Sequence, residues 1–260
     1  MAARLPSVFV SHGSPMHALH PGDAGEAWKA LGRGLPKPEA LLVASAHWET
    51  NVPMLTGAAK PETIHDFFGF PAPLYGLQYP APGSAPLAQQ AQALLRDAGF
   101  TAGIDGLRGI DHGVWAPLLY MYPDADVPVV QLSVQPALGP RHHFNLGKAL
   151  RKLSDEGVLV IGSGHLTHNL RDFDRTGKAT PMPYAVEFQK WVFDRIVQRE
   201  IDELADYRSR AQSGVRAHPT DEHFLPLFVA LGAAREDSKA ERIFDAIEAG
   251  ALAMDAYVFH

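Results

Sequence analysis

Two segments near the start of the chain decide the fold: SVFVSHG at residues 7–13 and LLVASAHW at residues 41–48. Each contains a run of apolar and small residues that is typical of a buried strand, and each reaches a histidine at its end, His12 or His47. In an open α/β sheet, the carboxyl ends of the strands form the ligand crevice. The two segments therefore predict a pair of imidazoles at one rim of a sheet, and neutral imidazole is a good ligand for zinc, copper, iron or nickel.

Further strand signals alternate with helix-length segments along the rest of the chain. Buried strands are expected at 127–134 and 158–164, and a last strand at 252–259. The expected helices lie at 24–31, 84–96, 112–121, 144–156, 184–207, 224–234 and 240–249. No internal repeat or Gly/Ser-rich linker divides the sequence. We therefore expect residues 1–260 to form a single α/β domain, with a mostly parallel central sheet flanked by helices and the active site at the carboxyl edge of its strands.

The composition argues against several functional classes. The net charge of −6, without a basic stripe, argues against nucleic acid as a partner. No apolar run approaches the roughly 20 residues that span a bilayer, so no membrane partner is expected. The first residues lack the features of a signal peptide, and we expect a cytoplasmic protein. Because the chain has no cysteine, nitrogen and oxygen atoms must hold any bound metal.

Two of the other histidine groups lie in local sequences that resemble a site. His112 follows Asp111 in the run DHGVW at the start of an expected helix. Asp111 could orient the imidazole, or it could only cap the helix and leave His112 inert. His165 and His168 follow the strand at 158–164, and their H-x-x-H spacing can place both on one helical face. The alternative is that His168 bonds to neighbouring backbone while His165 is exposed.

A third histidine group lies before the expected helix at 224–234. His223 is close to the amino end of that helix, where the helix dipole disfavours a cation. It must therefore project sideways, or coordinate a metal despite the dipole. The remaining histidines have no assigned role, and three of them are expected on the solvated surface: His142, His143 and His260.

Six segments together resemble the class III extradiol ring-cleavage dioxygenases, and within them the 4,5-DOPA-dioxygenase-like branch. In chain order they read SHGSPM at 11–16, SAHW at 45–48, IHDF at 64–67, DHGVW at 111–115, THNLR at 167–171 and EHFLPL at 222–227. They extend from the first strand to the penultimate helix, so the resemblance covers nearly the whole chain. It implies an enzyme that opens the aromatic ring of a DOPA-like catechol with O2.

The resemblance also implies roles for individual residues. His12, His47 and His223 would hold one divalent metal, which is Fe(II) in the active enzyme, although purified protein could carry Zn(II). His168 would be the acid–base group, or a fourth ligand when the metal is zinc. His112 would contact the substrate or the bound oxygen.

Extradiol enzymes typically use two histidines and one carboxylate as ligands, whereas this branch uses a third histidine. Glu222 and Glu49 remain alternative third donors to His223. The aromatic segment at 65–79 could stack on the substrate ring and exclude water, or could simply pack on the sheet.

Two other functions use the same residues or the same fold. The imidazoles could activate water in a zinc hydrolase, which would work without oxygen. The chain could also be a non-catalytic interaction module. For the dioxygenase, the expected partners are a small catechol and O2, and the chain could form a homo-oligomer.

Overall fold

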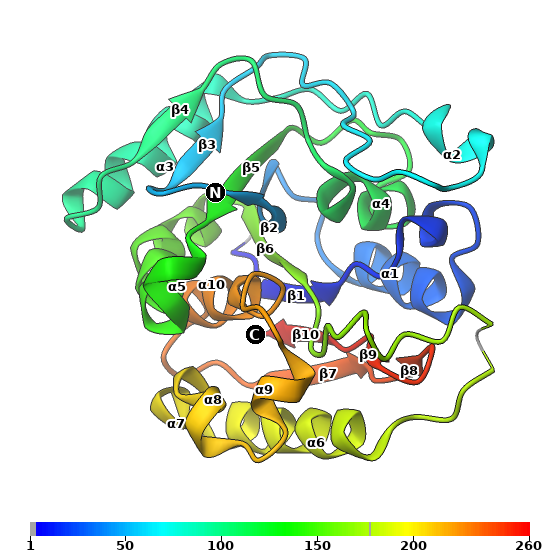
Figure 1. Ribbon diagram of the computed structural model, residues 1–260. Helices are drawn as coiled ribbons and strands as arrows, with labels where there is room; N and C mark the ends of the chain where they lie inside the picture. Colours follow the sequence, from blue (N-terminus) through cyan, green and yellow to red (C-terminus); the bar gives the residue numbers. More distant parts are fainter. Residues whose placement is uncertain (1–3, 177) are drawn as a thin grey trace.

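The computed structural model describes residues 4–176 and 178–260, and an eight-stranded sheet runs through the middle of the molecule (Figure 1). The strand order is β4-β3-β5-β2-β6-β1-β10-β7. The strands are β1 (Ser7–Ser11), β2 (Ala40–Glu49), β3 (Met54–Thr56), β4 (Gly103–Asp105), β5 (Val129–Val134), β6 (Val158–Gly164), β7 (Ala240–Phe244) and β10 (Ala256–Phe259). A separate pair is formed by β8 (Ile247–Glu248) and β9 (Leu252–Ala253).

The four central strands, β5, β2, β6 and β1, are parallel to one another. The sheet becomes mixed outside them, since β3 is antiparallel to β5 and β10 is antiparallel to β1. The central strands are long apolar runs because helices cover both of their faces. The expected α/β fold with a mostly parallel central sheet is confirmed.

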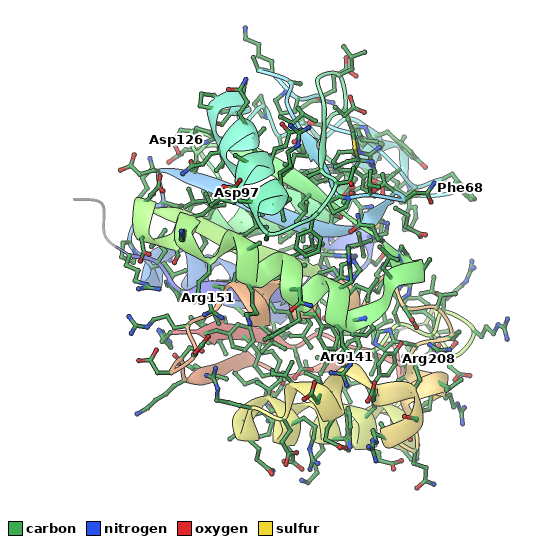
Figure 2. All side chains as sticks on the ribbon, turned by 90° about the vertical axis from the view of Figure 1, so that its left-hand side faces the viewer. Phe68, Asp97, Asp126, Arg141, Arg151 and Arg208 are labelled. Carbon is green, nitrogen blue, oxygen red and sulfur yellow. The ribbon has the colours of Figure 1, made fainter. Side chains whose placement is uncertain are left out.

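The alternation of side chains along β2 shows how the two faces are filled. Leu41 and Val43 pack in one apolar cluster with Trp28 and Trp115, which come from the helices α1 and α4. Leu42 and Ala44 point to the other face and pack with residues of α3 and α5. In the side view of Figure 2, α5 lies between α3 and the segment that contains α6 to α8.

The helices have the following bounds: α1 (Gly22–Gly34), α2 (Ala72–Tyr75), α3 (Ala85–Asp97), α4 (His112–Met121), α5 (Gly139–Leu150), α6 (Pro183–Gln198), α7 (Ile201–Ala205), α8 (Tyr207–Arg210), α9 (Gly214–Ala217) and α10 (Leu225–Ala233). Three short 3-10 helices are η1 (Pro15–Ala18), η2 (Pro136–Leu138) and η3 (Arg151–Glu156). Within the described residues, no helix is long and apolar enough to cross a membrane.

Several expected elements differ in extent or in kind. The helix expected at 144–156 is α5, Gly139–Leu150, followed by the 3-10 helix η3, and the strand expected at 252–259 is divided into β9 and β10, which belong to different sheets. The helix expected at 184–207 ends at Gln198, because Arg199 adopts a left-handed conformation with φ of 57°. The segment at 240–249 is not a helix but contains β7 and β8. Its alanines and charged residues favour a helix locally, but pairing of β7 with the edge of β10 overrides that preference.

Candidate metal centre

Three histidines from distant parts of the chain meet at the carboxyl edge of the parallel strands. His12 directly follows β1, His47 lies near the end of β2, and His223 lies in the turn before α10. The Nε2 atoms of His12 and His47 are 3.0 Å apart, and those of His47 and His223 are 3.3 Å apart. The three ligand atoms form one group that could hold a metal ion.

Glycines in β6 allow the segment with His223 to approach the sheet. A Cβ atom added at Gly164 would lie only 2.1 Å from the carbonyl oxygen of His223. A Cβ atom added at Gly162 would lie 2.0 Å from the carbonyl oxygen of Pro226, in the first turn of α10. The GSG sequence at the end of β6 is therefore a packing requirement of the third histidine.

The partners of His12 determine which of its nitrogens carries hydrogen. Its Nδ1 lies 3.1 Å from the hydroxyl oxygen of Ser163. That hydroxyl donates its own hydrogen to the carbonyl oxygen of Gly113. Ser163 must then accept from His12, so Nδ1 of His12 carries hydrogen and Nε2 presents a bare lone pair.

A carboxylate determines the same tautomer for His223. Its Nδ1 lies 2.9 Å from Oε1 of Glu222, which accepts hydrogen bonds, so Nδ1 carries hydrogen and Nε2 is left bare. Nδ1 of His47 lies 3.4 Å from Oδ2 of Asp66, a close approach of an imidazole to a carboxylate.

The bare lone pairs of His12 and His223 converge with Nε2 of His47, and a cation between these three nitrogen atoms would be bound by all of them. Burial, reinforced by the neighbouring histidines, holds the pKa of all three imidazoles well below the ordinary value of 6.5. They are therefore neutral at pH 7, which is the form that binds a metal. The donor set of the centre fits a divalent ion with imidazole affinity.

His112 borders the three histidines and is held by Asp66. Oδ2 of Asp66 accepts from Nδ1 of His112 at 2.9 Å, and Oδ1 accepts from the His112 backbone N–H at 2.9 Å. Burial alone would raise the pKa of Asp66, but its hydrogen bonds with His112 and the charges of His112 and His47 lower it to about 2. One ionised carboxylate thus orients His112 and lies close to His47.

His168 borders the group at His223, on which its ring is stacked. Their ring centroids are 3.5 Å apart and the planes differ by 12°. Burial, together with the nearby His112, lowers the pKa of His168 to about 4. Its backbone N–H donates to the carbonyl oxygen of Ala217 at 2.8 Å. The ring is therefore held neutral beside the metal group.

A family model described as the catalytic LigB subunit of aromatic ring-opening dioxygenase matches residues 6–259. The chain belongs to this family. A 4,5-DOPA dioxygenase extradiol of Beta vulgaris is 44% identical over 96% of this chain and 95% of that protein. The protein of the same name from Escherichia coli K12 is 40% identical over 97% of this chain and 94% of that protein. A crystal structure of an uncharacterised Escherichia coli K12 protein superimposes with a TM-score of 0.86 and 35% identity, covering 99% of this chain and 100% of that one.

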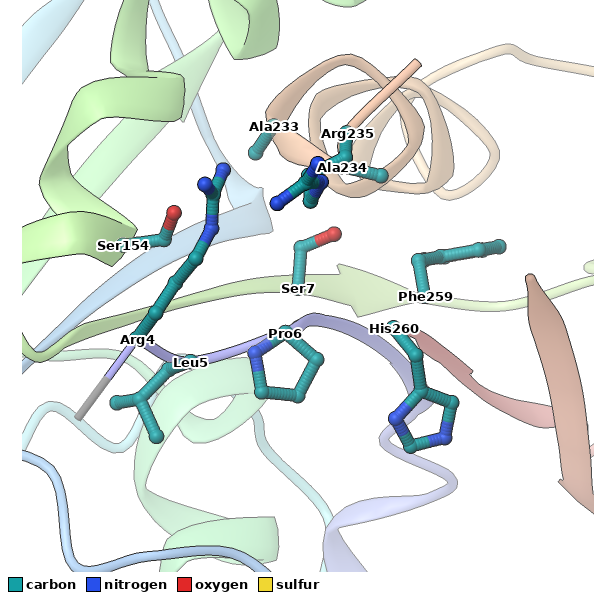
Figure 3. Close-up of a pocket in the computed structure, with 10 residues that line it drawn as sticks. All are labelled: Arg4, Leu5, Pro6, Ser7, Ser154, Ala233, Ala234, Arg235, Phe259 and His260. Atoms are coloured by element: carbon teal, nitrogen blue, oxygen red, sulfur yellow. The ribbon is translucent and has the colours of Figure 1, made fainter. Parts of the chain in front are cut away.

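The ring-opening dioxygenase therefore has one α/β fold, an extradiol activity on aromatic rings, and a histidine group able to hold its metal. The structure brings together all five histidines that the sequence singled out. A different cavity of about 270 Å³ lies near the start of β1, at the far end of that strand from His12 (Figure 3). Among the described residues that line it, only His260 is a histidine.

Asp66, and not Asp111, is the partner of His112 in the dioxygenase, and neither of the two roles considered for Asp111 is correct. Asp111 makes no capping hydrogen bond and does not orient His112. It is buried and accepts from the hydroxyl of Ser45 at 2.7 Å and from the side-chain amide of Gln131. In the sequence, Asp66 could be noticed only as part of the IHDF segment. Its contact with His112 joins residues 46 positions apart, which no local pattern indicates.

Other histidine expectations are corrected by their surroundings. The segment with His165 and His168 is not helical, so the two do not share a helical face. His165 is buried, not exposed. His143 is also buried instead of solvated, since it accepts from the backbone N–H of Gln135 and donates to the carbonyl oxygen of Gly139. His142 is half-buried, whereas His260 is exposed as expected.

Proposed function

We propose that the chain is an Fe(II)-dependent extradiol dioxygenase of a DOPA-like catechol, with His12, His47 and His223 as its metal ligands. The convergence of three Nε2 atoms, 3.0 and 3.3 Å apart in two of the pairs, carries this proposal. Several relatives that align with nearly the whole chain share the name 4,5-DOPA dioxygenase extradiol, which supports a DOPA-like substrate. Family membership favours ring opening over the hydrolase and over a non-catalytic role.

A redox-active divalent ion, when bound, supplies acidity to the catechol hydroxyls and a path for electrons to dioxygen, whereas zinc has no redox chemistry. The third ligand is assigned to His223 because Glu222 already accepts from Nδ1 of His223 and from the hydroxyl of Thr220. Glu222 then acts as the outer partner that orients a ligand, as carboxylates do in many metal sites. Glu49, the other alternative, is exposed and does not belong to the group of converging ligand atoms.

His168 is assigned as the acid–base group. A ring nitrogen of His168 lies close to ligand atoms of Glu222 and His223, but His168 does not belong to the group of His12, His47 and His223. This supports a position beside the metal ligands and argues against His168 as a fourth ligand. Burial keeps the imidazole neutral at pH 7, so it is free to take the proton of a catechol hydroxyl and to return it later.

His112 is assigned to contact the substrate or the oxygen. Asp66 occupies its Nδ1–H, which leaves Nε2 as the atom available to a ligand.

An aromatic group from the loop after β3 forms a wall beside His112. The Phe67 ring meets His112 edge-on at 5.6 Å and packs against Tyr75 and Phe70. Phe67 is buried, whereas Tyr75 is 38% exposed. This arrangement supports the expectation that the segment at 65–79 shields the substrate ring from water.

An oxygen electrode with apoprotein reconstituted in Fe(II) tests the proposal. We expect L-DOPA to consume one O2 per catechol and to yield a yellow semialdehyde, and zinc-loaded protein to be inactive. Tyrosine, a para-substituted monophenol, serves as the control compound, and we expect no O2 consumption with it. Ester or amide cleavage that persists without oxygen would instead favour the hydrolase.

The outer carboxylate gives a second prediction. Asp66→Asn removes the charge that holds Nδ1–H of His112 and lies close to His47, while keeping nearly the same volume. We expect metal affinity to fall by about 10- to 100-fold, the usual cost of losing such a partner. Competition with a chromophoric chelator measures it, and Asp194→Asn in α6, where the carboxylate pairs with Lys190, is the control. An affinity equal to that of wild type would remove Asp66 from the centre.

A further inference from the structure

His17 in η1, five residues after His12, has acceptors on both of its ring nitrogens. Nδ1 lies 3.0 Å from the carbonyl oxygen of Ser14, and Nε2 lies 2.8 Å from Oε2 of Glu248. A carbonyl only accepts hydrogen bonds, and so does an ionised carboxylate. Both nitrogens of His17 must then carry hydrogen, which makes the ring an imidazolium. Its side chain is only 11% exposed, so this charge depends on its partner.

The surroundings of His17 agree with that charge state. Burial alone would lower the pKa of His17, but the hydrogen bond and charge of Glu248, with the Ser14 carbonyl, raise it above its ordinary value. The α1 side presents Trp28, whose uncharged ring is 6.0 Å away. The segment after β6 presents His165, whose pKa burial holds well below the ordinary value, so it is neutral. Among the described residues, Glu248 is the charged group that pairs with His17.

The His17 ring packs directly on the turn that carries His12. Gly13 adopts a φ of 72°, and a Cβ atom there would lie 2.4 Å from Nδ1 of His17. The ring thus occupies the space that a side chain at position 13 would need. A shift of His17 must be transmitted to this turn, because packed atoms leave no free volume.

Glu248 belongs to the β8–β9 hairpin, which also contacts the backbone on both sides of the metal group. The hydroxyl of Ser11, the residue before His12, donates to the carbonyl oxygen of Ala253 at 3.1 Å. The hydroxyl of Thr167, the residue before the acid–base histidine, donates to the carbonyl oxygen of Ala251 at 2.7 Å. The backbone N–H of Ala253 in turn donates to Thr167. One hairpin therefore contacts both the end of β1 before His12 and the loop after β6 that carries His168.

We propose that the His17–Glu248 ion pair is a positioning element of the metal centre, which ties the turn after His12 to the β8–β9 hairpin and thereby raises metal affinity. His17 and Glu248 touch neither the metal nor the substrate, so they act through His12. The inference rests on the proposed role of His12 as a ligand. Ser11 and Thr167 supply the other two connections of the same hairpin.

The ion pair has a characteristic dependence on pH. Below the pKa of His17 both hydrogen bonds are present, and the full contribution to metal affinity is made. As the pH rises through that raised pKa, the ring loses a proton and one bare nitrogen faces an acceptor, so the contribution is lost. The direct ligands behave in the opposite way, because they bind better as protons leave them.

Zinc affinity of the apoprotein between pH 6 and pH 9, measured by chelator competition, tests the inference. At pH 6 we expect Glu248→Gln and His17→Gln each to bind Zn²⁺ about tenfold more weakly than wild type. This is the lower end of the loss in affinity that removal of an outer partner of a metal ligand usually causes. By pH 9 the ratio between the zinc affinity of wild type and that of each variant should approach one. The double variant should be no weaker than either single variant, since both remove the same contact.

The chain offers a matched control in a second histidine–glutamate pair. Nε2 of His260 lies 2.8 Å from Oε2 of Glu241, the same length, but the pair is exposed near the end of β10. Glu241→Gln should leave zinc affinity unchanged at every pH. Thermal unfolding of each apo variant identifies any that is not folded, and the comparison then rests on the other single variant.

Two results would overturn the inference: a ratio of one at pH 6, or a tenfold ratio that persists unchanged to pH 9. The second would mean a merely structural contact. The His12→Ala variant separates this failure from that of the proposed function. If His12→Ala retains zinc affinity, the proposed ligand set itself is rejected. If His12→Ala loses zinc affinity but Glu248→Gln binds zinc as wild type does, only the role of the ion pair is rejected.

Discussion

His12→Ala is expected to abolish stoichiometric metal binding and ring-opening activity together. The side chain supplies one of three Nε2 lone pairs that converge on one point, and two imidazoles alone leave the ion mostly hydrated. The loss of affinity should exceed the roughly 10- to 100-fold that removal of an outer partner costs. Metal content per chain, measured on protein reconstituted with Fe(II) or Zn(II), is the primary readout, and oxygen uptake with L-DOPA is the second.

The control for this experiment is another histidine that lies outside the group. His260→Ala removes an exposed imidazole and should leave both metal content and oxygen uptake as in wild type. His47→Ala and His223→Ala should behave like His12→Ala. Full metal content in any of the three would exclude that residue from the ligand set, and would leave Glu222 or Glu49 to be tested as donors.

His168→Ala is expected to separate chemistry from metal binding. The ring does not belong to the group of His12, His47 and His223, so metal content should stay close to one ion per chain. The variant loses the group that we propose takes and returns the catechol proton, and kcat should fall by about 100- to 10,000-fold. Single-turnover measurements of ring opening under saturating O2 provide the comparison.

Stacking of His168 on His223 calls for a second variant. Removal of the ring leaves a gap beside a ligand, which could itself disturb the metal. His168→Phe keeps an aromatic face against His223 but cannot exchange a proton. We expect it to hold the metal and to remain as slow as His168→Ala. Recovery of turnover in His168→Phe would show that the ring acts only by packing.

Local sequence was sufficient for the central strands and for several of the helices. The apolar runs at 7–11, 41–46 and 158–164 are strands because burial on both faces leaves such residues few alternatives. The rule that strand ends meet at one rim was enough to bring His12 and His47 together. The complete set of five histidines was predicted from the order of six segments along the chain. Resemblance to a family gave that order a meaning, whereas the periodicity of apolar residues did not.

Tertiary structure decided the contacts that join residues far apart in the chain. Asp66 replaced Asp111 as the partner of His112, and β7 formed in a segment whose residues favour a helix, because pairing energy outweighs local propensity. The charge of His17 depends on Glu248, which lies 231 residues later. The sequence by itself determined which imidazoles could reach the sheet rim. Only the folded chain determined their protonation and orientation, because these depend on acceptors that no local pattern specifies.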